Sequence, residues 1–523
     1  MNHSLLQEAI HFHQQNKLDE AEKIYLSLLD KNKEEFNLLF LLGTLNIQKD
    51  KFSSAILFLN RAIAINADFP EIYYNLGLAH NALGAFDSAL ASYDQAIALQ
   101  PNYPEAFINR GNVLQELKDF DSALASYDQA IALQPNYAEA FNNRGAVYKS
   151  IDSDQLALND FKFAYSLDGT FYKSIYNIGT IFFENGDISN AINYFHLALK
   201  INCHYFDANW NLSLCYLLLG NYKNGWELYE WRWKNADSPF FKNKRILPKT
   251  LWLGNLSLAD KTIYIHHEQG FGDTIQFCRY IPLLCRISKK VIFNVQGSLL
   301  ELIKSNLGEY CEIISAEPDV NSYDFHCPLL SLPLALGNLS GDFSVKPFFL
   351  KADINYISKW SQLIKIKRKF RVGLAWCSTS DFKNDHLRSL NFKQILPFIE
   401  ENFDSFEFIC VQKEIKNTDK ELFFSSNKVT YYGDNLDSFS DTAGLLANLD
   451  LVITTCTSVA HLSGSLGIPT WLLLSFVPDF RWGLSGSKSV WYPNVVLYRQ
   501  SIKNNWFTVL HNINQDLKSY LTA

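Results

Sequence analysis

The sequence predicts an α-solenoid followed by an α/β region with two parallel sheets. In the first half, the segment Phe86–Tyr103 recurs unchanged at Phe120–Tyr137, 34 positions later. A fixed period of roughly 20–50 residues is typical of repeat arrays. From about Leu247 the pattern changes, and short strand-like runs alternate with helical segments. Such alternation predicts parallel sheets flanked by helices.

The composition favours a folded chain and excludes several function classes. Hydrophobic residues make up 48% and charged residues 19% of the 523 residues, so the chain can bury cores. The net charge of −7 argues against a nucleic-acid partner, which favours a basic face. Nine scattered cysteines without a C-x-x-C pair indicate free thiols in a reducing compartment. Neither an apolar leader nor a run of about 18 apolar residues occurs, so we expect a cytoplasmic protein without a membrane span.

Seven repeats align on the 34-residue period within residues 1–240. They begin at Asn2, Phe36, Pro70, Pro104, Ala138, Tyr172 and Phe206. Position 8 is small in every repeat: Ala9, Gly43, Gly77, Gly111, Gly145, Gly179 and Ser213. Position 20 is also small, from Ala21 to Gly225. We expect two helices to cross at these positions, because only small side chains let their backbones come close.

This pattern resembles the tetratricopeptide repeat, which implies stacked helical hairpins whose first helices line a concave groove. Position 6 of that helix is an asparagine in five repeats: Asn75, Asn109, Asn143, Asn177 and Asn211. Amides can hydrogen-bond an extended peptide whatever its sequence. The repeats are also similar to those of O-GlcNAc transferase, which use such a ladder. We therefore expect these residues to bind a protein or peptide acceptor. The alternative is that asparagine is merely common at this position.

Two sets of strands are predicted in the second half. They cover Thr262–His266, Lys290–Val295, Cys311–Ser315 and Tyr323–Cys327, and then Arg371–Trp376, Phe406–Val411, Lys428–Tyr432, Leu449–Thr454 and Thr470–Leu474. Two sets imply two Rossmann-like lobes, which we place at residues 241–355 and 356–523 and join near Lys351–Arg368. Ligands of such folds bind beyond the carboxyl ends of the strands. A final helix is predicted over Trp506–Tyr520.

Three motifs lie at predicted strand ends. They span Ile265–Leu284, Val372–Leu390 and Leu449–Leu474. In the first, Gly270 and Gly272 permit a tight turn before Asp273 opens a helix. The second ends near the basic Arg388. The third consists of a strand, a Thr/Ser-rich turn, a short helix that carries His461, and another strand.

In this order the motifs, with the tail Trp491–Gln500, resemble the heptosyltransferase-like domain with a two-lobed GT-B fold that follows tetratricopeptide repeats in many bacterial proteins. The resemblance covers roughly Leu251–Gln500 and implies an inverting glycosyltransferase that uses a nucleotide-sugar donor. It also implies that Asp273 is catalytic, as the general base for the acceptor hydroxyl. The alternative is that Asp273 only caps its helix. In two-lobed transferases the terminal helix often packs on the first lobe, and we expect the same here.

The phosphate groups of such a donor match the third motif and Arg388. The turn Thr455–Thr457 presents backbone N–H groups at a helix N-terminus, where anions bind. Arg388 would neutralise phosphate oxygens, and His461 faces either the cleft or the core. The expected donor-binding residues are Gly270, Gly272, Arg388, Thr455, Thr457, Ser458 and His461. Weaker candidates for a contact with donor or acceptor are Glu268, Gln412 and Lys413.

Cys456 departs from the related heptosyltransferases, which commonly have Asp at this position, and argues against ADP-heptose as the donor. The motifs contain no acidic pair for a divalent ion. We therefore expect a metal-independent reaction without a cofactor, in which the nucleotide sugar is a substrate. Two alternatives stay open: a non-catalytic repeat scaffold with a degenerate transferase region, and an enzyme that acts on a lipopolysaccharide core sugar.

Overall fold

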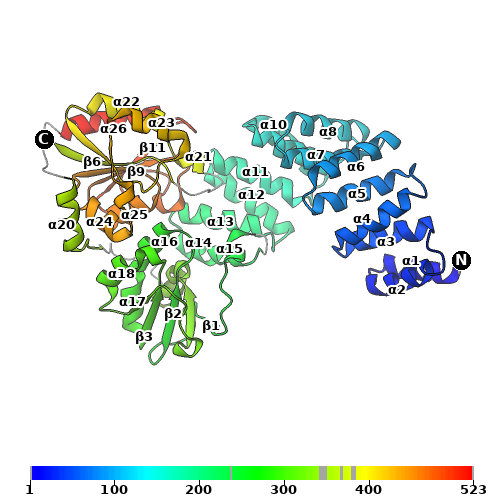
Figure 1. Cartoon of the computed structure of the whole chain (residues 1–523), viewed down its shortest axis with the longest axis horizontal. Helices are drawn as coiled ribbons and strands as arrows, with labels where there is room; N and C mark the ends of the chain where they lie inside the picture. The colour runs from blue at the N-terminus through cyan, green and yellow to red at the C-terminus, as the bar shows by residue number, and fades with distance from the viewer. Residues whose placement is uncertain (1–2, 236–237, 341–349, 365–368, 379–384, 521–523) are drawn as a thin grey trace. The chain divides into compact units, whose positions relative to one another are not determined.

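The computed structural model describes residues 3–235, 238–340, 350–364, 369–378 and 385–520. Contacts within the chain group it into two units (Figure 1). Unit 1 comprises Met1–Ile181 and Asn193–Cys203, and unit 2 comprises Phe182–Ile192 and His204–Ala523. The predicted domain borders at residues 240 and 355 stay predictions, and residues 365–368 of the predicted linker lie outside the described ranges.

Residues 3–229 form seven helical hairpins. Their helices are α1 (His3–Gln14), α2 (Leu18–Leu29), α3 (Phe36–Gln48), α4 (Phe52–Ile63), α5 (Pro70–Ala82), α6 (Phe86–Leu99), α7 (Pro104–Glu116), α8 (Phe120–Leu133), α9 (Ala138–Ser150), α10 (Asp154–Leu167), α11 (Tyr172–Glu184), α12 (Ile188–Ile201), α13 (Phe206–Leu218) and α14 (Tyr222–Tyr229). From the second hairpin on, each first helix begins at the residue that the 34-residue period predicts. Pro70 and Pro104 occupy first-turn positions, where the fixed φ of proline suits a helix and the missing N–H costs nothing.

Glycines at position 8 mark the helix crossings in unit 1. A Cβ atom at Gly77 would lie 2.4 Å from Cε1 of Tyr93, and one at Gly111 would lie 2.7 Å from Cε1 of Tyr127. Both tyrosines are fully buried. No side chain fits between the helices at these points, which is the reason the sequence suggested for small residues at position 8.

Unit 2 contains two sheets. The first has strands β1 (Thr250–Leu251), β2 (Thr262–His266), β3 (Lys290–Asn294), β4 (Glu312–Ile314) and β5 (Phe325–Pro328), in the order β1-β5-β2-β3-β4. The second has β6 (Phe370–Ala375), β7 (Phe406–Cys410), β8 (Thr430–Tyr431), β9 (Leu451–Thr455), β10 (Thr470–Leu474) and β11 (Val495–Arg499), in the order β11-β10-β9-β6-β7-β8. The nine strand pairs of these two sheets are parallel. The α/β prediction is therefore confirmed, although β1 and β11 were not predicted as strands.

Helices cover both faces of the second sheet. Figure 1 shows α22, α23 and α26 on one side of it and α20, α24 and α25 on the other. Every residue of β9 and β10 is buried, as expected for strands with helices on both faces. The helices of unit 2 beyond the hairpins are α15 (Pro239–Lys242), α16 (Phe271–Phe277), α17 (Ile281–Ile287), α18 (Leu300–Leu307), α19 (Leu332–Ser340), α20 (Ile354–Leu363), α21 (Asp385–Arg388), α22 (Phe392–Asn402), α23 (Asn417–Ser426), α24 (Phe439–Leu446), α25 (Ser458–Ser465) and α26 (Phe507–Tyr520).

The terminal helix α26 packs on the second sheet. Ile513 is fully buried in the hydrophobic cluster that contains Val372 of β6. Nδ2 of Asn402, at the end of α22, donates a hydrogen bond to Oδ1 of Asn514 at 2.7 Å. The expectation that this helix packs on the first lobe is therefore wrong, because its apolar face completes the core of the second sheet.

A buried ion pair fastens the seventh hairpin to the first sheet, both within unit 2. Arg232, in the short 3-10 helix η1 (Glu230–Trp233) after α14, donates from Nε and Nη2 to the two carboxylate oxygens of Glu268 at 2.9 and 3.0 Å. Arg232 is fully buried and Glu268 is nearly so. Loss of either partner would leave an uncompensated charge inside the protein. Glu268 therefore has a structural role in the chain, whereas the sequence suggested a donor or acceptor contact.

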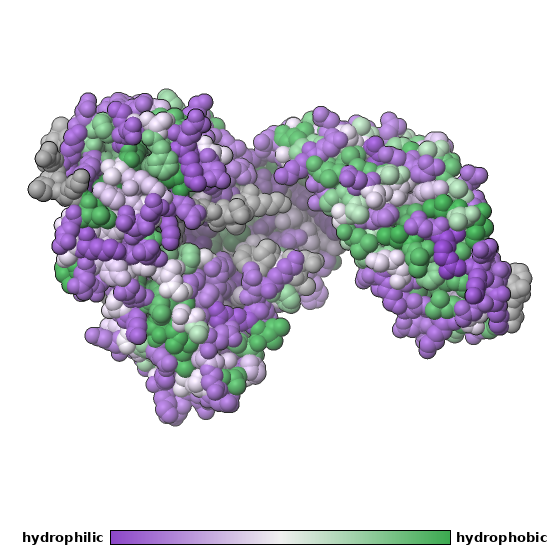
Figure 2. All heavy atoms as spheres, viewed as in Figure 1, coloured by the Kyte–Doolittle hydropathy of each residue, from purple (hydrophilic) through white to green (hydrophobic). Residues whose placement is uncertain are grey.

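Polar and hydrophobic residues are mixed on the visible face of the protein. Figure 2 shows hydrophilic residues spread over the visible face of each unit, with hydrophobic residues interspersed among them. Single exposed hydrophobic residues are normal on folded proteins. No helix within the described ranges is both long and apolar enough to cross a membrane.

Candidate functional site

The strand orders create two reversal points at the carboxyl ends of the sheets. In the second sheet the chain runs outward from β6 to β8 and then returns to the other side of β6 with β9. In the first sheet the same reversal lies between β2 and β5. Ligands of open parallel sheets bind where the strand order reverses. The first and third sequence motifs follow β2 and β9, so both motifs lie at such points.

Helices α16 and α25, which follow these reversal points, pack directly against each other. A Cβ atom at Gly272 would lie 2.9 Å from Cδ2 of His461 and 3.4 Å from Cα of Ser458. Gly272 thus allows two helices to touch. The positive φ of the preceding loop belongs to Gln269, at 59°, whereas Gly270 is extended, with φ −85°. The expectation that the two glycines make the tight turn is wrong, because the turn is made at Gln269.

Asp273 lies in the first turn of α16 with both carboxylate oxygens engaged. Its Oδ2 accepts a hydrogen bond from the backbone N–H of Gly270 at 2.9 Å. Its Oδ1 forms an ion pair with Nη2 of Arg481. Burial raises the pKa of Asp273, against the opposing effects of Arg481 and the Gly270 N–H. Asp273 therefore caps its helix, as the alternative reading held, and also lies in a charged site beyond a strand end.

Arg481 is the main residue of this site that the sequence motifs did not identify. It lies in the 3-10 helix η7 (Phe480–Trp482) and is buried. Besides Asp273, it contacts Oε1 of Gln276 through Nε at 2.7 Å and Oδ1 of Asp479 through Nη1 at 2.9 Å. Three side chains thus surround one guanidinium group. The sequence offered one signal for it: Arg481 stands between Phe480 and Trp482, and an arginine among aromatic residues is often buried. A buried arginine needs several hydrogen-bond acceptors nearby.

His461 faces the core. It is 4% exposed, its Nδ1 lies 3.1 Å from the hydroxyl oxygen of Tyr492, and its ring stacks on Trp482 with centroids 5.2 Å apart. Burial, together with the charges of Arg481 and Arg279, lowers the pKa of His461 well below its usual value. The imidazole is therefore neutral near pH 7. The sequence left open whether His461 faces the cleft or the core, and in the structure it faces the core.

The last residue of β9 carries a buried hydroxyl group with unmet hydrogen-bonding capacity. Thr455 is fully buried, and its Oγ1 has no hydrogen-bond partner among the described residues. Oγ1 of Thr457 lies 3.3 Å from Oγ1 of Thr454, and both Thr457 and Ser458 are half-buried. Helix α25 begins at Ser458, so the backbone N–H groups of its first turn, which have no partner within the helix, lie close to these hydroxyl groups.

Cys456, in the same turn, is not a nucleophile. It is 9% exposed and its Sγ accepts a hydrogen bond from Nε1 of Trp482 at 3.1 Å. Burial raises the pKa of the Cys456 thiol to about 11. The thiol therefore stays protonated near pH 7, and Cys456 contributes to packing in this turn.

Arg388 ends α21 and acts electrostatically on Asp273. Its Nε donates to Oδ1 of Asp385 at 3.1 Å, and the other oxygen of Asp385 accepts from Nζ of Lys416 at 2.6 Å. The charge of Arg388 lowers the pKa of Asp273, with a smaller effect than burial, Arg481 or the N–H group of Gly270. The second motif thus comes near the first. Residues 379–384 of this motif lie outside the described ranges.

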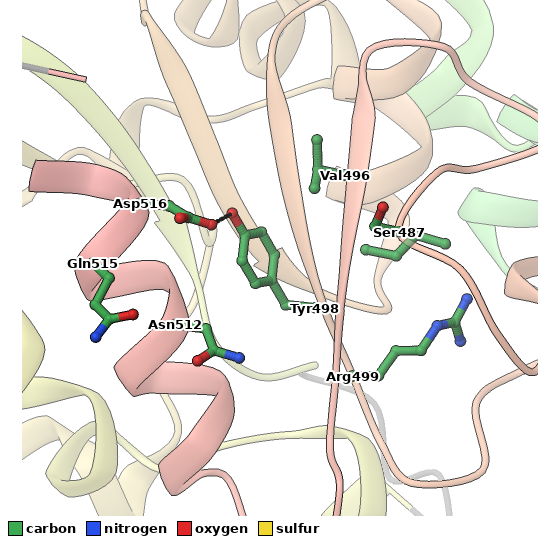
Figure 3. A pocket seen from close by; sticks show the side chains of 8 residues that line it. Ser487, Val496, Tyr498, Arg499, Asn512, Gln515 and Asp516 are labelled. Atoms are coloured by element: carbon green, nitrogen blue, oxygen red, sulfur yellow. Dashed lines mark hydrogen bonds between the residues drawn. The ribbon is translucent and has the colours of Figure 1, made fainter. Parts of the chain in front are cut away.

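A pocket of ≈ 410 Å³ lies between β11 and α26. Figure 3 shows Tyr498 and Arg499 from the strand and Asn512, Gln515 and Asp516 from the helix around it. The hydroxyl of Tyr498 donates to Oδ2 of Asp516 at 2.7 Å. None of the residues predicted for the site lines this pocket, so we do not assign the predicted chemistry to it.

A second pocket of ≈ 620 Å³ lies beyond the carboxyl end of β7. Its lining includes Lys413, Lys416, Lys420, Phe424 and Tyr431. Lys416 connects it to Arg388 through their shared partner Asp385. The ring of Phe424 is exposed and that of Tyr431 is half-buried, and Glu414 and Asp434 also line the pocket. The three ammonium groups beside the two rings suit an anionic ligand with a flat ring.

Gln412, a weaker candidate, has a structural role beside this pocket. Its Oε1 accepts hydrogen bonds from the backbone N–H groups of Trp376 at 2.6 Å and Cys377 at 3.2 Å. It thereby ties the loop after β6 to the loop after β7. Within the described ranges, no group of three or more His, Cys, Asp or Glu side chains could hold a metal ion. Metal independence itself stays a prediction.

The position-6 asparagines belong to a chain of hydrogen bonds along unit 1. In order, the linked side chains are Tyr74, Asn109, Asn112, Asn143, Asn142 and Asn177, with donor–acceptor distances from 2.9 to 3.5 Å. Asn75 donates separately to Oγ1 of Thr44 at 3.1 Å. Asn211 lies half-buried on α13, in unit 2. The amides therefore link neighbouring repeats, and their contact with a peptide stays a prediction.

Two members of this chain, Asn112 and Asn142, were missed by sequence reasoning. They occupy positions 9 and 5 of their repeats. Asn112 is the i+3 neighbour of Asn109 and could have been found from helix geometry, whereas Asn142 directly precedes Asn143 and is linked to it by the hydrogen bond between their side chains.

Comparison with known families identifies the N-terminal region. A family model described as "TPR repeat" matches residues 45–84, 80–118 and 111–151, and one described as "Tetratricopeptide repeat" matches residues 172–202. About the first 200 residues therefore contain tetratricopeptide repeats, as the sequence predicts.

Among curated proteins, Protein FlbA of Caulobacter vibrioides is 23% identical over 336 residues, which cover 59% of this chain and 54% of FlbA. The chain thus spans about half the length of this relative. Similar solved structures are MamA (23% identity, TM-score 0.30, 31% of this chain and 94% of MamA), YrrB, described as a TPR protein with an unusual peptide-binding site (20%, 0.30, 35% and 95%), and a tetratricopeptide repeat protein from Parabacteroides merdae (16%, 0.40, 44% and 90%).

Proposed function

We propose that the chain is a glycosyltransferase of the two-lobed GT-B kind, which moves a sugar from a nucleotide-sugar donor to a protein held by the repeats. The observation that carries the proposal is the meeting of the first and third motifs through α16 and α25. Asp273 lies in α16, which follows β2 of the first sheet, and the turn Thr455–Thr457 leads from β9 of the second sheet into α25, which packs against α16. A donor in one crevice and an acceptor in the other would meet there.

Asp273 is the proposed general base. Each of its carboxylate oxygens accepts one hydrogen bond, from Gly270 or Arg481, so lone pairs remain for an acceptor hydroxyl. In the proposed step, the acceptor oxygen bonds to the anomeric carbon while the bond from that carbon to the nucleotide phosphate breaks. The hydroxyl proton passes to Asp273, and the leaving phosphate takes the electron pair. Because burial raises its pKa, Asp273 would be a stronger base than an exposed aspartate.

The proposed donor subsite runs from the pocket beyond β7 to the N-terminus of α25. The aromatic base of the nucleotide would lie near Phe424 and Tyr431. The phosphates of the nucleotide would contact Arg388 and the first backbone N–H groups of α25. The hydroxyl of Thr455, which has no partner among the described residues, lies at the end of β9, three residues before the first residue of α25. In this proposal, the positive charge of Arg388 and the hydrogen-bond donors of the turn stabilise the negative charge that develops on the leaving nucleotide, so that no metal ion is needed.

Donor binding tests this function directly. Isothermal titration of the full chain with UDP-, GDP-, ADP- and CMP-sugars in EDTA should show that one nucleotide class binds. Arg388→Ala should weaken that binding by about tenfold or more, because a charge-assisted contact to phosphate is lost. Lys393→Ala removes the same charge from an exposed site on the neighbouring helix α22 and should leave the affinity unchanged.

A strict need for magnesium or manganese would contradict the proposed mechanism. If no nucleotide sugar binds the intact chain, the α/β region is not a transferase. The chain would then be a repeat scaffold for protein–protein interaction, which its tetratricopeptide repeats favour in any case.

A further inference from the structure

The acidic charge of the chain is concentrated in repeats 3–5. Residues 70–171 contain thirteen Asp and Glu but only five Lys and Arg, a net charge of −8. The whole chain carries −7, so all other residues together carry +1. A local field of this kind favours a positively charged partner.

Several aspartates of these repeats are neutralised by neighbouring arginines. Arg110 pairs with Asp94 at 2.6 Å, and Arg144 pairs with Asp128 at 2.6 Å and Asp160 at 2.8 Å. The first two pairs join adjacent repeats and the third lies within one repeat, and all three reduce the charge that these aspartates offer to a partner.

Three glutamates at position 2 are different. Glu71, Glu105 and Glu139 lie in the first turns of α5, α7 and α9. None of them has an ion-pair partner within the part of unit 1 that the structure describes. Because α5 contacts α7 and α7 contacts α9, the three carboxylates follow one another along one face. Positions 2, 5, 6 and 9 share that face, so it also carries the amide chain.

Tyrosines lie among these glutamates. The rings of Tyr74 and Tyr103 have centroids 5.1 Å apart, and both are half-buried. Burial, and after it the charge of Glu105, raises the pKa of Tyr74. Burial, and then Tyr74 and Glu71, raises the pKa of Tyr103. The tyrosine hydroxyls and the carboxylates therefore lie within electrostatic reach of one another.

Unmet polar groups lie beside and beneath the same face, where the ring centroid of Tyr93 is 6.0 Å from that of Tyr74. The hydroxyl of Tyr127 donates to Oδ1 of Asn112, a member of the amide chain, at 2.8 Å. Tyr93, one repeat earlier, is fully buried, and Leu78 stands at the position equivalent to Asn112, so the Tyr93 hydroxyl has no partner within the described residues. Oε2 of Glu71 is also buried and has no hydrogen-bond partner in the part of the chain that the structure describes. Buried polar groups of native proteins are normally satisfied, so both groups point to a ligand.

We propose that this face, formed by the first helices of repeats 3–5 and here called the Tyr–Glu face, binds an extended protein segment that carries lysine or arginine side chains. The cations would lie beside the glutamates and over the tyrosine rings. The amide chain would bond to the backbone of the segment. The inference deepens the proposed function, because the bound segment would be the acceptor, but the binding step does not depend on sugar transfer.

Peptide binding to the full chain tests this proposal. The probes are three fluorescein-labelled peptides of about 12 residues, long enough at ~3.3 Å per residue to follow three repeats. They alternate serine with lysine, glutamate or glutamine. Fluorescence anisotropy should show that the lysine peptide binds about tenfold or more tightly than the glutamine peptide, and that its affinity falls as salt rises from about 0.1 to 0.5 M.

Matched variants locate the effect. Glu71→Gln with Glu105→Gln should weaken binding of the lysine peptide by about tenfold. Asp87→Asn with Asp121→Asn removes the same charge from exposed first turns of α6 and α8 in the same repeats, and should change the affinity by less than about twofold. The far-ultraviolet circular dichroism of all variants should match that of the parent.

Equal affinity for the lysine and glutamine peptides, a preference for glutamate, or an equal loss in both double variants would overturn the proposal. Titration of the Glu71→Gln, Glu105→Gln variant with nucleotide sugars separates the two functions. Normal donor binding with lost peptide binding supports the Tyr–Glu face, whereas absent donor binding in the parent chain removes the transferase and leaves the peptide result standing.

Discussion

The repeats of unit 1 and the α/β region of unit 2 build their polar sites from very different distances along the chain. In unit 1, the amide chain joins residues of adjacent repeats, such as Asn109 with Tyr74 at a separation of 35 positions. In unit 2, Asp273 and its partner Arg481 are 208 positions apart. A repeated polar contact can be read from the period, whereas a contact between two sheets depends on how the whole α/β region folds.

Two helices of identical sequence sharpen this point. Helices α6 and α8 read the same from end to end. Even so, Tyr127 of α8 donates to Asn112, whereas the equivalent Tyr93 of α6 has no partner among the described residues. The difference lies in the preceding helix, where position 9 is Leu78 in one repeat and Asn112 in the other. Local sequence thus determines the helix, and the neighbouring element determines what its side chains do.

The largest effect is expected at the long-range site. Asp273→Asn keeps the size of the side chain and an acceptor for the Gly270 N–H but removes the proposed base. Turnover of the nucleotide sugar should fall by ~10²–10⁴-fold, the range for one general base, with little change in donor affinity. In the parent chain, turnover should be lost on the acid side as Asp273 protonates, at a pH above that of an ordinary aspartate, because burial raises its pKa.

Asp479→Asn is the matched control for this change. It removes the other carboxylate partner of Arg481 while leaving Asp273 intact. We expect a much smaller loss of turnover in steady-state assays. If both variants lose turnover equally, Asp273 serves to balance the charge of Arg481 and is not the base.

The next effect tests whether the two regions act separately. Repeats contact mainly their neighbours, so removal of residues 1–137 should leave the remaining hairpins and the α/β region folded. Donor affinity should stay normal in titration, while the KM for a protein acceptor rises by about 10², because recruitment contributes binding and not chemistry. Full transfer by the shortened chain would refute recruitment by the repeats. The Glu71→Gln, Glu105→Gln variant repeats the test without shortening the chain.

A smaller effect is expected where α16 touches α25. Gly272→Ala would place a Cβ atom 2.9 Å from His461, so we expect a loss of about 1–3 kcal/mol in the free energy of unfolding. Gly270→Ala has only the Asp273 carboxylate at 3.4 Å and an extended φ, and should be nearly neutral. Urea unfolding of the two variants checks this. Similar losses would mean that the helix contact does not limit the choice of residue at 272.

The smallest effect compares the two identical helices. Tyr127→Phe removes a hydroxyl that donates to Asn112 and should cost about 1 kcal/mol in the free energy of unfolding. Tyr93→Phe removes a buried hydroxyl without a partner in the free chain and should be neutral or slightly stabilising. With the lysine peptide bound, the Tyr93 variant should lose its advantage if that hydroxyl serves the ligand. An equal cost of both changes in the free chain would contradict the difference in partners.

Much of the fold follows from local patterns. Nine strands occur within the segments predicted for them or within one or two residues of their ends, because buried parallel strands are short apolar runs with few alternatives. Two strands escaped prediction: β1 has only two residues, and β11 lies within the Trp491–Gln500 tail, which was read as a motif. The position of the terminal helix in the sequence was predicted correctly, but the helix was assigned to the wrong lobe. The apolar face of a helix shows that it packs on a core and does not show which sheet it covers.

The sequence by itself determined the repeats. A 34-residue period with small residues at each crossing leaves one way to stack the hairpins, so helix starts, crossing glycines and the asparagine column could all be read in advance. Only the tertiary structure decided the α/β site. Arg481 could not be assigned to Asp273, nor Gly272 to His461, because the energies of buried charges and close contacts depend on neighbours that are distant in the chain and are brought together by the packing of α16 on α25.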